Sequence, residues 1–181
     1  MNIFDIAKQN QEKAWQVIKN TNIIQIWEDA GAKINLVGSL RTGLLMKHRD
    51  IDFHIYSSPL NLTDSFQAMA RLAENPSIKR IECANLLHTA EACIEWHAWY
   101  QNEENELWQM AMIHTREGSR YDGYFEKVAQ RISEIMTDEI RETILRLKYE
   151  TPETEKITGV EDYEAVIRDG VRDYSGFKEW R

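Results

Sequence analysis

The sequence predicts an α+β (α/β) fold in which a mixed β-sheet is flanked by helices and followed by a helical C-terminal tail. Apolar residues recur at helical spacing in residues 3–18 and again from residue 121 onward. Residues 50–55 alternate strictly between polar and apolar, which is typical of a half-buried strand. We expect residues 1–150 to form an α/β domain and residues 151–181 a helical extension packed on it.

The elements follow one another in a regular order. A first helix is expected from Ile3 to Ile18 and a second from about Asn22 to Ala30, where Gly31 suits the position after a helix end. Further helices are predicted over 66–73 and 121–135, with a short turn or helix over 44–46. Two runs that flank residues 102–105 predict a hairpin. The predicted strands are 34–37, 50–55, 78–84, 93–100 and 107–115.

Two helix starts can be read from the polar residues of the tail. Thr137 is a suitable N-cap for a helix that contains Ile140, Ile144 and Leu147. Residues 158–161 fit a capping box, which predicts that a last helix begins there.

Charge and hydropathy narrow the class of protein. The net charge of −8 weighs against non-specific binding to nucleic acid or to an anionic membrane, because such binding needs clustered Lys and Arg. The N-terminal residues lack the pattern of a signal peptide, and no apolar run approaches the length of a membrane span. We therefore expect a cytoplasmic protein without a membrane partner.

The strand around Asp50 and Asp52 carries the most informative chemistry. Successive side chains of a strand point to opposite faces, so Ile51 and Phe53 face the core while the two acids share the other face with His54. Neighbouring carboxylates repel one another unless a positive charge lies between them. Mg²⁺ is commonly held by one or two carboxylates together with phosphates, so we expect it here. The alternative is a solvated strand face with two surface acids.

The segment before this strand suits phosphate groups. Gly38 lets the backbone approach a ligand, and Ser39 offers a hydroxyl where a helix would start. Arg41, Lys47 and Arg49 make this the most basic segment of an acidic chain, and we expect phosphate contacts from it. An ordinary turn and a solvated loop are the alternatives.

The spacing of these residues resembles a known signature. Residues 37–39 (Val-Gly-Ser), ten residues, and then 50–53 (Asp-Ile-Asp-Phe) are similar to the pattern of the polymerase-beta-type nucleotidyltransferase superfamily. The hairpin that follows resembles its small bacterial members that modify antibiotics. The resemblance implies two-metal transfer of a nucleotidyl group, with Gly38 and Ser39 holding the triphosphate and Asp50 and Asp52 as ligands of Mg²⁺.

One part of the family pattern is missing. Members usually carry a third acid on a later strand beside the two aspartates, and Ala111 occupies the place where we expect it. Glu95, on the partner strand of the hairpin, is the best substitute for this catalytic acid. Its reach depends on the hairpin register, because a slip of one residue would turn it to the other face.

The main hypothesis is a Mg²⁺-dependent enzyme that moves a nucleoside monophosphate from an NTP, ATP foremost, to a hydroxyl group of a small molecule or a protein. The alternative is a catalytically degenerate protein that acts as a nucleotide-binding or protein-interaction module. A third hypothesis is an interaction protein, for example a homo-oligomer, whose aromatic hairpin is the interface. Those aromatic residues could also pack against a helix or stack on a nucleobase; they are Trp96, Trp99, Tyr100 and Trp108.

Overall fold

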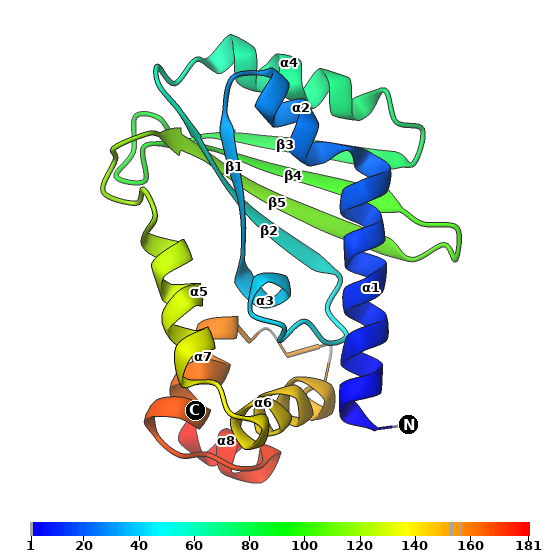
Figure 1. Ribbon diagram of the computed structural model, residues 1–181, viewed down its shortest axis with the longest axis vertical. Coiled ribbons are helices and arrows are strands. Elements are labelled where there is room, and N and C mark those ends of the chain that lie inside the picture. The colour runs from blue at the N-terminus through cyan, green and yellow to red at the C-terminus, as the bar shows by residue number, and fades with distance from the viewer. Residues whose placement is uncertain (1, 153, 156) are drawn as a thin grey trace.

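A five-stranded β-sheet crosses the middle of the molecule in the computed structural model, which describes residues 2–152, 154–155 and 157–181 (Figure 1). The strand order is β1-β2-β5-β4-β3. β2 and β5 are parallel, and the other neighbouring pairs are antiparallel, so the sheet is mixed as predicted. The strands are β1 (Lys33–Val37), β2 (Asp50–Ser57), β3 (Ile78–Asn85), β4 (Cys93–Gln101) and β5 (Leu107–Arg116).

Helices cover both faces of the sheet and form a separate group beyond one end of it (Figure 1). α1, α2 and α4 pack on one face, while α5 packs on β1 at the other face. None of the helices in the described part of the chain has the length and apolarity needed to cross a bilayer. The helices are α1 (Ile3–Thr21), α2 (Ile23–Asp29), α3 (Gly38–Arg41), α4 (Leu62–Ala73), α5 (Tyr124–Ile135), α6 (Asp138–Glu150), α7 (Gly159–Tyr163), the π-helix η1 (Glu164–Arg168) and α8 (Tyr174–Trp180).

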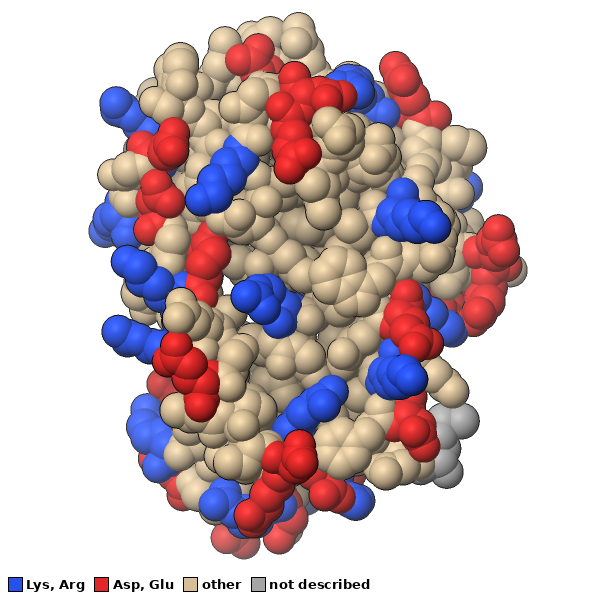
Figure 2. All heavy atoms as spheres, viewed as in Figure 1, with Lys and Arg blue, Asp and Glu red and all other residues tan. Residues whose placement is uncertain are grey.

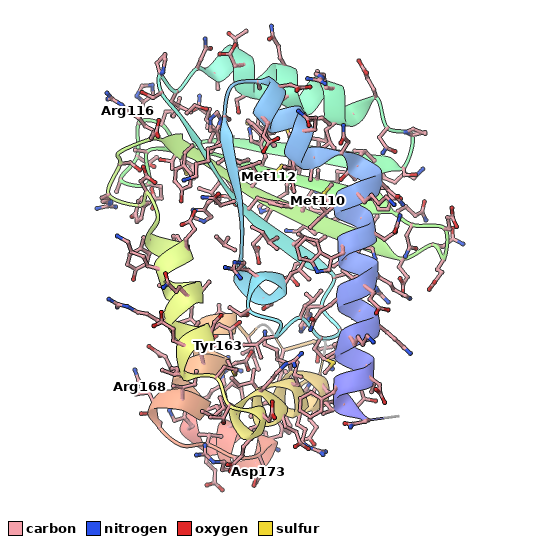
Figure 3. The ribbon with its side chains drawn as sticks, viewed as in Figure 1. Met110, Met112, Arg116, Tyr163, Arg168 and Asp173 are labelled. Atoms are coloured by element: carbon pink, nitrogen blue, oxygen red, sulfur yellow. The ribbon has the colours of Figure 1, made fainter. Side chains whose placement is uncertain are left out.

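The alternation of β2 sets which side chains reach the core. Ile51, Phe53 and Ile55 are fully buried, and they pack with Met110 and Met112 of β5 beneath α1, α2 and α4 (Figure 3). Each such side chain stabilises the fold by about 2 kcal/mol when it leaves water. This burial commits the opposite face of β2 to Asp50, Asp52 and the residues beside them.

Two helices begin at their predicted capping residues, whereas two other helical segments differ from the prediction. Thr137 caps α6, and Thr158 forms the capping box of α7 with Glu161. The prediction for 44–46 was wrong, because the short helix lies earlier, at α3, and these three buried residues form no regular element. The helix expected from residue 121 begins only at Tyr124, because Gly123 at φ 70° interrupts the helical backbone.

A second apolar cluster joins the two ends of the chain. Ile3 and Ala7 of α1 pack with Ile144 and Leu147 of α6, and with Phe177 of α8. α1 therefore spans both clusters, since its later residues belong to the core under the sheet. This long helix holds the C-terminal helical group at a fixed place beside the sheet.

His114 of β5 lies in a polar network inside the main core. Its Nε2 is 2.8 Å from the Ser57 hydroxyl, and its Nδ1 is 3.0 Å from the Ser65 hydroxyl, which also accepts a hydrogen bond from Trp96. Burial lowers the pKa of His114 to about 4. The folded state therefore holds the neutral ring.

This burial predicts a loss of stability in acid. A folded-state pKa below the ordinary value contributes stability that is complete above pH 6.5 and is lost as the pH falls toward 4. We expect the natural chain to lose its advantage over His114→Gln by on the order of 2–3 kcal/mol between pH 7 and 4. Urea unfolding at both pH values measures the difference, in which other titrating groups cancel. His88→Gln, in an exposed loop, is the control, and an unchanged difference for His114→Gln would contradict the account.

Candidate functional site

Asp50 and Asp52 project from the same face of β2, next to the end of β1. Asp52 lies opposite Val37 on one side and opposite Ala111 of β5 on the other. The chain leaves β1 immediately after Val37, so Gly38 and α3 stand directly beside the carboxylate. The structure thus brings together the acidic pair and the glycine–serine turn that the sequence indicated.

Gly38 is required at this turn for two reasons. Its φ of +68° is a conformation that side-chain-bearing residues rarely adopt. A Cβ at this position would also overlap the Asp52 carboxylate. The backbone therefore packs against the acid in a way that only glycine permits.

The carboxylates of Asp50 and Asp52 repel each other, and burial adds to the cost of ionising Asp52. Burial, and after it the charge of Asp50, raise the pKa of Asp52 to about 7, and the charge of Lys148 opposes both effects. Two close carboxylates, one of them poorly solvated, are the donor set that fits a hard divalent cation such as Mg²⁺. Among the described residues, no His, Cys or third acid joins them in a cluster that could complete a protein-only metal site.

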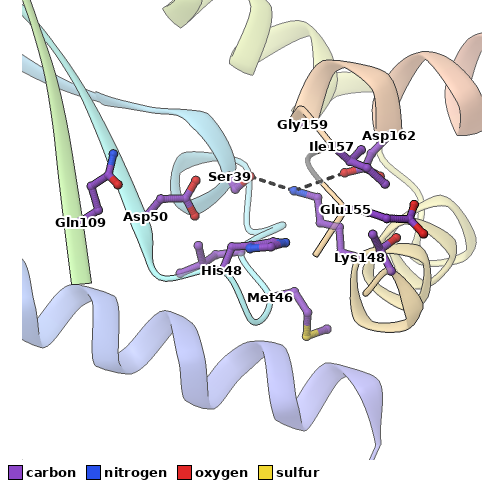
Figure 4. A pocket seen from close by; sticks show the side chains of 12 residues that line it. Ser39, Met46, His48, Asp50, Gln109, Lys148, Glu155, Ile157, Gly159 and Asp162 are labelled. Atoms are coloured by element: carbon purple, nitrogen blue, oxygen red, sulfur yellow. Dashed lines mark hydrogen bonds and ion pairs between the residues drawn. The ribbon is translucent and has the colours of Figure 1, made fainter. Parts of the chain in front are cut away.

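Lys148 is a site residue that sequence reasoning missed. It lies on α6, and its ammonium group donates a hydrogen bond of 2.9 Å to the Ser39 hydroxyl and lies 3.9 Å from Asp162 Oδ2 (Figure 4). The residue is only 9% exposed, which is unusual for lysine. A signal was available, because Lys148 follows Ile144 by one helical turn and so lies on the buried face of α6.

Asp162 and Tyr163 of α7 complete this corner of the site. Asp162 is 4% exposed, and its Oδ1 has no hydrogen-bond partner within the described ranges of the chain. Burial raises its pKa to about 6. The Tyr163 hydroxyl is 3.4 Å from the Ser39 hydroxyl, and Figure 3 places this ring between α3 and the C-terminal helices. The π-helix η1 begins at the next residue, and π-turns occur frequently at functional sites.

Two cavities meet at Ser39 and Asp50. One is polar and holds about 500 Å³. The other is more apolar, holds about 410 Å³ and extends from Asp52 to α5 and α7. The polar cavity is lined by Ser39, His48, Asp50, Gln109, Lys148, Glu155 and Asp162, among others. The apolar cavity is lined by Asp52, His54, Ala111, Ile113, Phe125, Val128, Ile132, Val160 and Tyr163, among others.

The basic residues predicted for phosphate binding lie elsewhere. The Lys47 ammonium group donates to the backbone oxygens of Tyr149 and Thr151, and Arg49 forms a 3.1 Å ion pair with Glu106. Arg41 lines a separate hollow between β1 and α5. The two cavities at the acidic pair are lined by none of the three in the part of the chain that the structure describes. Lys148 supplies the positive charge that we expected from this loop.

Glu95 lies on the predicted face of the sheet but at a distance from the acidic pair. It pairs with Ile113 on β5, whereas the residue opposite Asp52 is Ala111, whose partner on β4 is His97. The Glu95 carboxylate lies 3.4 Å from His97 Nε2. One strand, β5, therefore separates Glu95 on β4 from β2, and Ala111 on that strand offers no carboxylate.

The aromatic hairpin contributes mainly to the core. Trp96, Tyr100 and Trp108 are buried on the face that packs under α1, α2 and α4. Trp99 lies on the opposite face, where the Arg80 guanidinium sits 4.6 Å from its ring centroid. Packing thus accounts for three of the four aromatic residues.

The raised pKa of Asp52 predicts that this residue trades stability for function. Stability from its protonated form is complete below pH 3.8 and is lost as the pH rises through about 7. In metal-free buffer at pH 8 we expect Asp52→Asn to be more stable than the natural chain by on the order of 2–3 kcal/mol. Denaturant unfolding at pH 8 and pH 5 measures it, and the gain should shrink at the lower pH. Asp64→Asn, on the exposed first turn of α4, is the control; a destabilised Asp52→Asn would contradict the assignment.

Comparison with known proteins gives a structural likeness and no sequence match. No family model matches the chain, and no curated protein is similar to it in sequence. The structure of Cid1 that concerns its RNA terminal uridylyl transferase activity has a TM-score of 0.60 and 12% identity, over 88% of this chain and 47% of that one. Cid1 poly(U) polymerase with MgGTP bound has a TM-score of 0.57 and 11% identity, over 81% of this chain and 46% of that one.

A second kind of polymerase has the same core. The non-canonical poly(A) polymerase complex GLD-2–GLD-3 matches with a TM-score of 0.58 and 7% identity, over 92% of this chain and 57% of that one. This chain therefore spans about half the length of these neighbours. The chain has the mixed-sheet nucleotidyltransferase fold of these polymerases.

Proposed function

We propose that this protein is a Mg²⁺-dependent nucleotidyltransferase, which moves a nucleoside monophosphate from an NTP to a hydroxyl group. The observation that carries the proposal is the convergence of Ser39, the Asp50–Asp52 pair and Lys148 on one cavity system. Ser39 and the two acids come from the consecutive elements α3 and β2, whereas Lys148 comes from α6, much later in the chain. Two solvated acids on a strand surface would not explain why a buried lysine lies beside them and why one carboxylate packs against the backbone of a glycine.

Each residue has a distinct role in this proposal. Ser39 and Lys148 bind the β- and γ-phosphates, because a hydroxyl and an ammonium group 2.9 Å apart can share phosphate oxygens. Gly38 lets the phosphates approach the backbone, and Asp162 holds the Lys148 ammonium group near Ser39. Asp50 and Asp52 would hold Mg²⁺, which supplies positive charge to the attacking and leaving oxygens when it is bound.

The acceptor is a hydroxyl compound that reaches Asp52 over the open part of the sheet. The fold neighbours include a poly(U) polymerase and a poly(A) polymerase. The net charge of −8 and the interspersed acidic and basic residues in Figure 2 favour a small molecule or a protein over a long nucleic acid. ATP is the first NTP to test, and we place the reaction in the cytoplasm. An acceptor on a second copy of the chain would make the protein a self-modifying homo-oligomer.

Asp52→Asn should abolish nucleotidyl transfer and weaken binding of the Mg²⁺–NTP complex, because one carboxylate of the pair is lost. We expect a fall in transfer of at least about 100-fold, and Asp64→Asn should behave as the natural chain. The assay follows radiolabel from α-labelled NTPs into a panel of short RNAs, polyols, aminoglycosides and the protein itself. Normal transfer by Asp52→Asn would refute the assignment of the site.

The position of Ala111 favours a second candidate, a nucleotide-binding module without turnover. Ala111 lies opposite Asp52, where a carboxylate could accept the proton of the attacking hydroxyl, and Glu95 is two strands away. This module would bind the same Mg²⁺–NTP complex without consuming it.

Ala111→Asp separates the two candidates. If the chain is an enzyme, the natural protein transfers label, and Ala111→Asp raises the rate by about 100-fold through general-base catalysis. Ala111→Asn, which has the same size without the charge, should give no gain. Transfer by Ala111→Asp alone would identify a degenerate enzyme and contradict the proposed activity of the natural chain.

A further inference from the structure

His54 is a buried residue in the lining of the apolar cavity. It lies on β2, two residues beyond Asp52 and on the same face, between Asn35 of β1 and Ile113 of β5. The ring is 6% exposed and packs against Phe125 of α5, with 4.5 Å between ring centroids. It also contributes to the wall of the cavity that begins at the acidic pair.

The hydrogen-bonding capacity of this ring is unused. His54 Nδ1 is buried and has no hydrogen-bond partner among the described residues. A buried polar atom without a partner costs stability, so such an atom in a folded protein needs an explanation. His114 shows the usual arrangement in this same molecule, since each of its ring nitrogens meets a serine hydroxyl. A neutral imidazole offers one hydrogen-bond donor and one acceptor.

The cavity around His54 has the character of a nucleoside site. Phe125 and Tyr163 offer aromatic faces, and aliphatic side chains of α5 and Val160 supply much of the remaining wall. About 410 Å³ is ample for a base with its sugar. The lining of this cavity is mostly apolar, and small-molecule sites likewise combine apolar packing with a few orienting hydrogen bonds.

The apolar cavity adjoins the proposed phosphate site, which indicates what part of an NTP it could bind. It shares Ser39 and Asp50 with the polar cavity, where Lys148 lies. In an NTP the nucleoside is bonded to the α-phosphate, which the proposed reaction places at Asp50 and Asp52. The nucleoside continues from this point, and its base suits an apolar, aromatic space.

We propose that the apolar cavity receives the nucleoside of the NTP and that His54 hydrogen-bonds to it, which makes His54 a residue that determines nucleotide specificity. This inference rests on the proposed function, because it takes the phosphate position from Ser39 and Lys148. The partner atom is a polar atom of the base or a hydroxyl group of the sugar. The imidazole of His54 gives a higher affinity to the nucleosides that can form this hydrogen bond.

Calorimetric titration of ligands in the presence of Mg²⁺ tests the proposal without requiring turnover. The ligands are ATP, GTP, CTP and UTP, their 2′-deoxy forms, and inorganic tripolyphosphate, which has no nucleoside. His54→Phe keeps the ring shape and removes the hydrogen bond, while His54→Gln restores a donor and an acceptor. We expect His54→Phe to weaken the preferred NTP by about tenfold and to leave tripolyphosphate within about twofold, with partial recovery in His54→Gln.

Two further variants show whether a loss of binding in His54→Phe comes from misfolding. Phe125 is 40% exposed, so Phe125→Ala should fold, and we expect it to weaken the NTP but not tripolyphosphate. Phe66 on α4 is 49% exposed on the other side of the sheet, and Phe66→Ala is its matched control. Loss of a 2′-deoxy preference in His54→Phe would assign the bond to the sugar, and loss of a base preference would assign it to the base.

The failures of the two proposals are distinguishable. If the natural chain binds tripolyphosphate and NTPs equally tightly, or if His54→Phe and Phe125→Ala leave NTP affinity unchanged, the nucleoside site is refuted while the phosphate site stands. If the natural chain binds neither ligand with Mg²⁺, the proposed function itself fails, and the role of His54 fails with it.

Discussion

The contact between the Asp52 carboxylate and the backbone of Gly38 is the constraint on which the site depends. It places an acid against a turn that no larger residue could form. It also keeps that acid poorly solvated and beside the charge of Asp50, which raises its pKa to about 7. Such an arrangement lowers stability unless a cation neutralises it, and the proposed transfer of a nucleoside monophosphate to a hydroxyl group would use a divalent cation at this place.

The site is completed by elements that the chain reaches much later. α6 and α7 bring Lys148 and Asp162 to Ser39, and α1 holds their helical group by packing in both apolar clusters. The sheet alone would present two acids and a hydroxyl without a positive charge. A buried lysine that already donates to Ser39 would pre-organise the proposed phosphate contacts, because it would lose little side-chain freedom when a ligand binds.

Sequence patterns predicted the parts of this structure that depend on local periodicity. The strict alternation after Asp50 indicated both β2 and the face of its acids, and the capping residue Thr137 marked the start of α6. The third acid depended on strand register: Ala111 is at the predicted place opposite Asp52, while Glu95 is two strands away. The order and register of the paired strands set the distance between Glu95 and Asp52, and the sequence of one strand does not predict them.

The residues proposed to contact phosphate could not be predicted from local periodicity. The basic loop before β2 has no periodicity, so its side chains follow local partners; Arg49 pairs with Glu106 and Lys47 with backbone oxygens after α6. Lys148 was hidden in an ordinary amphipathic helix, where a lysine is usually solvated. The short helix α8 lacked a clear pattern, because its few turns are stabilised by the second apolar cluster. Val166 and Ile167 indicated that the helix beginning near residue 158 continues, but not that this part of it is a π-helix.

The central claim is that the acidic pair and the phosphates are bridged by a divalent cation in one site. Thermal unfolding with each NTP, in the presence of Mg²⁺ or of a chelator, tests it directly because a ligand that binds the folded state raises its stability. The account predicts a rise in Tm for at least one NTP with Mg²⁺ and little or none with the chelator. Equal rises under both conditions, or no rise with any NTP, would contradict it.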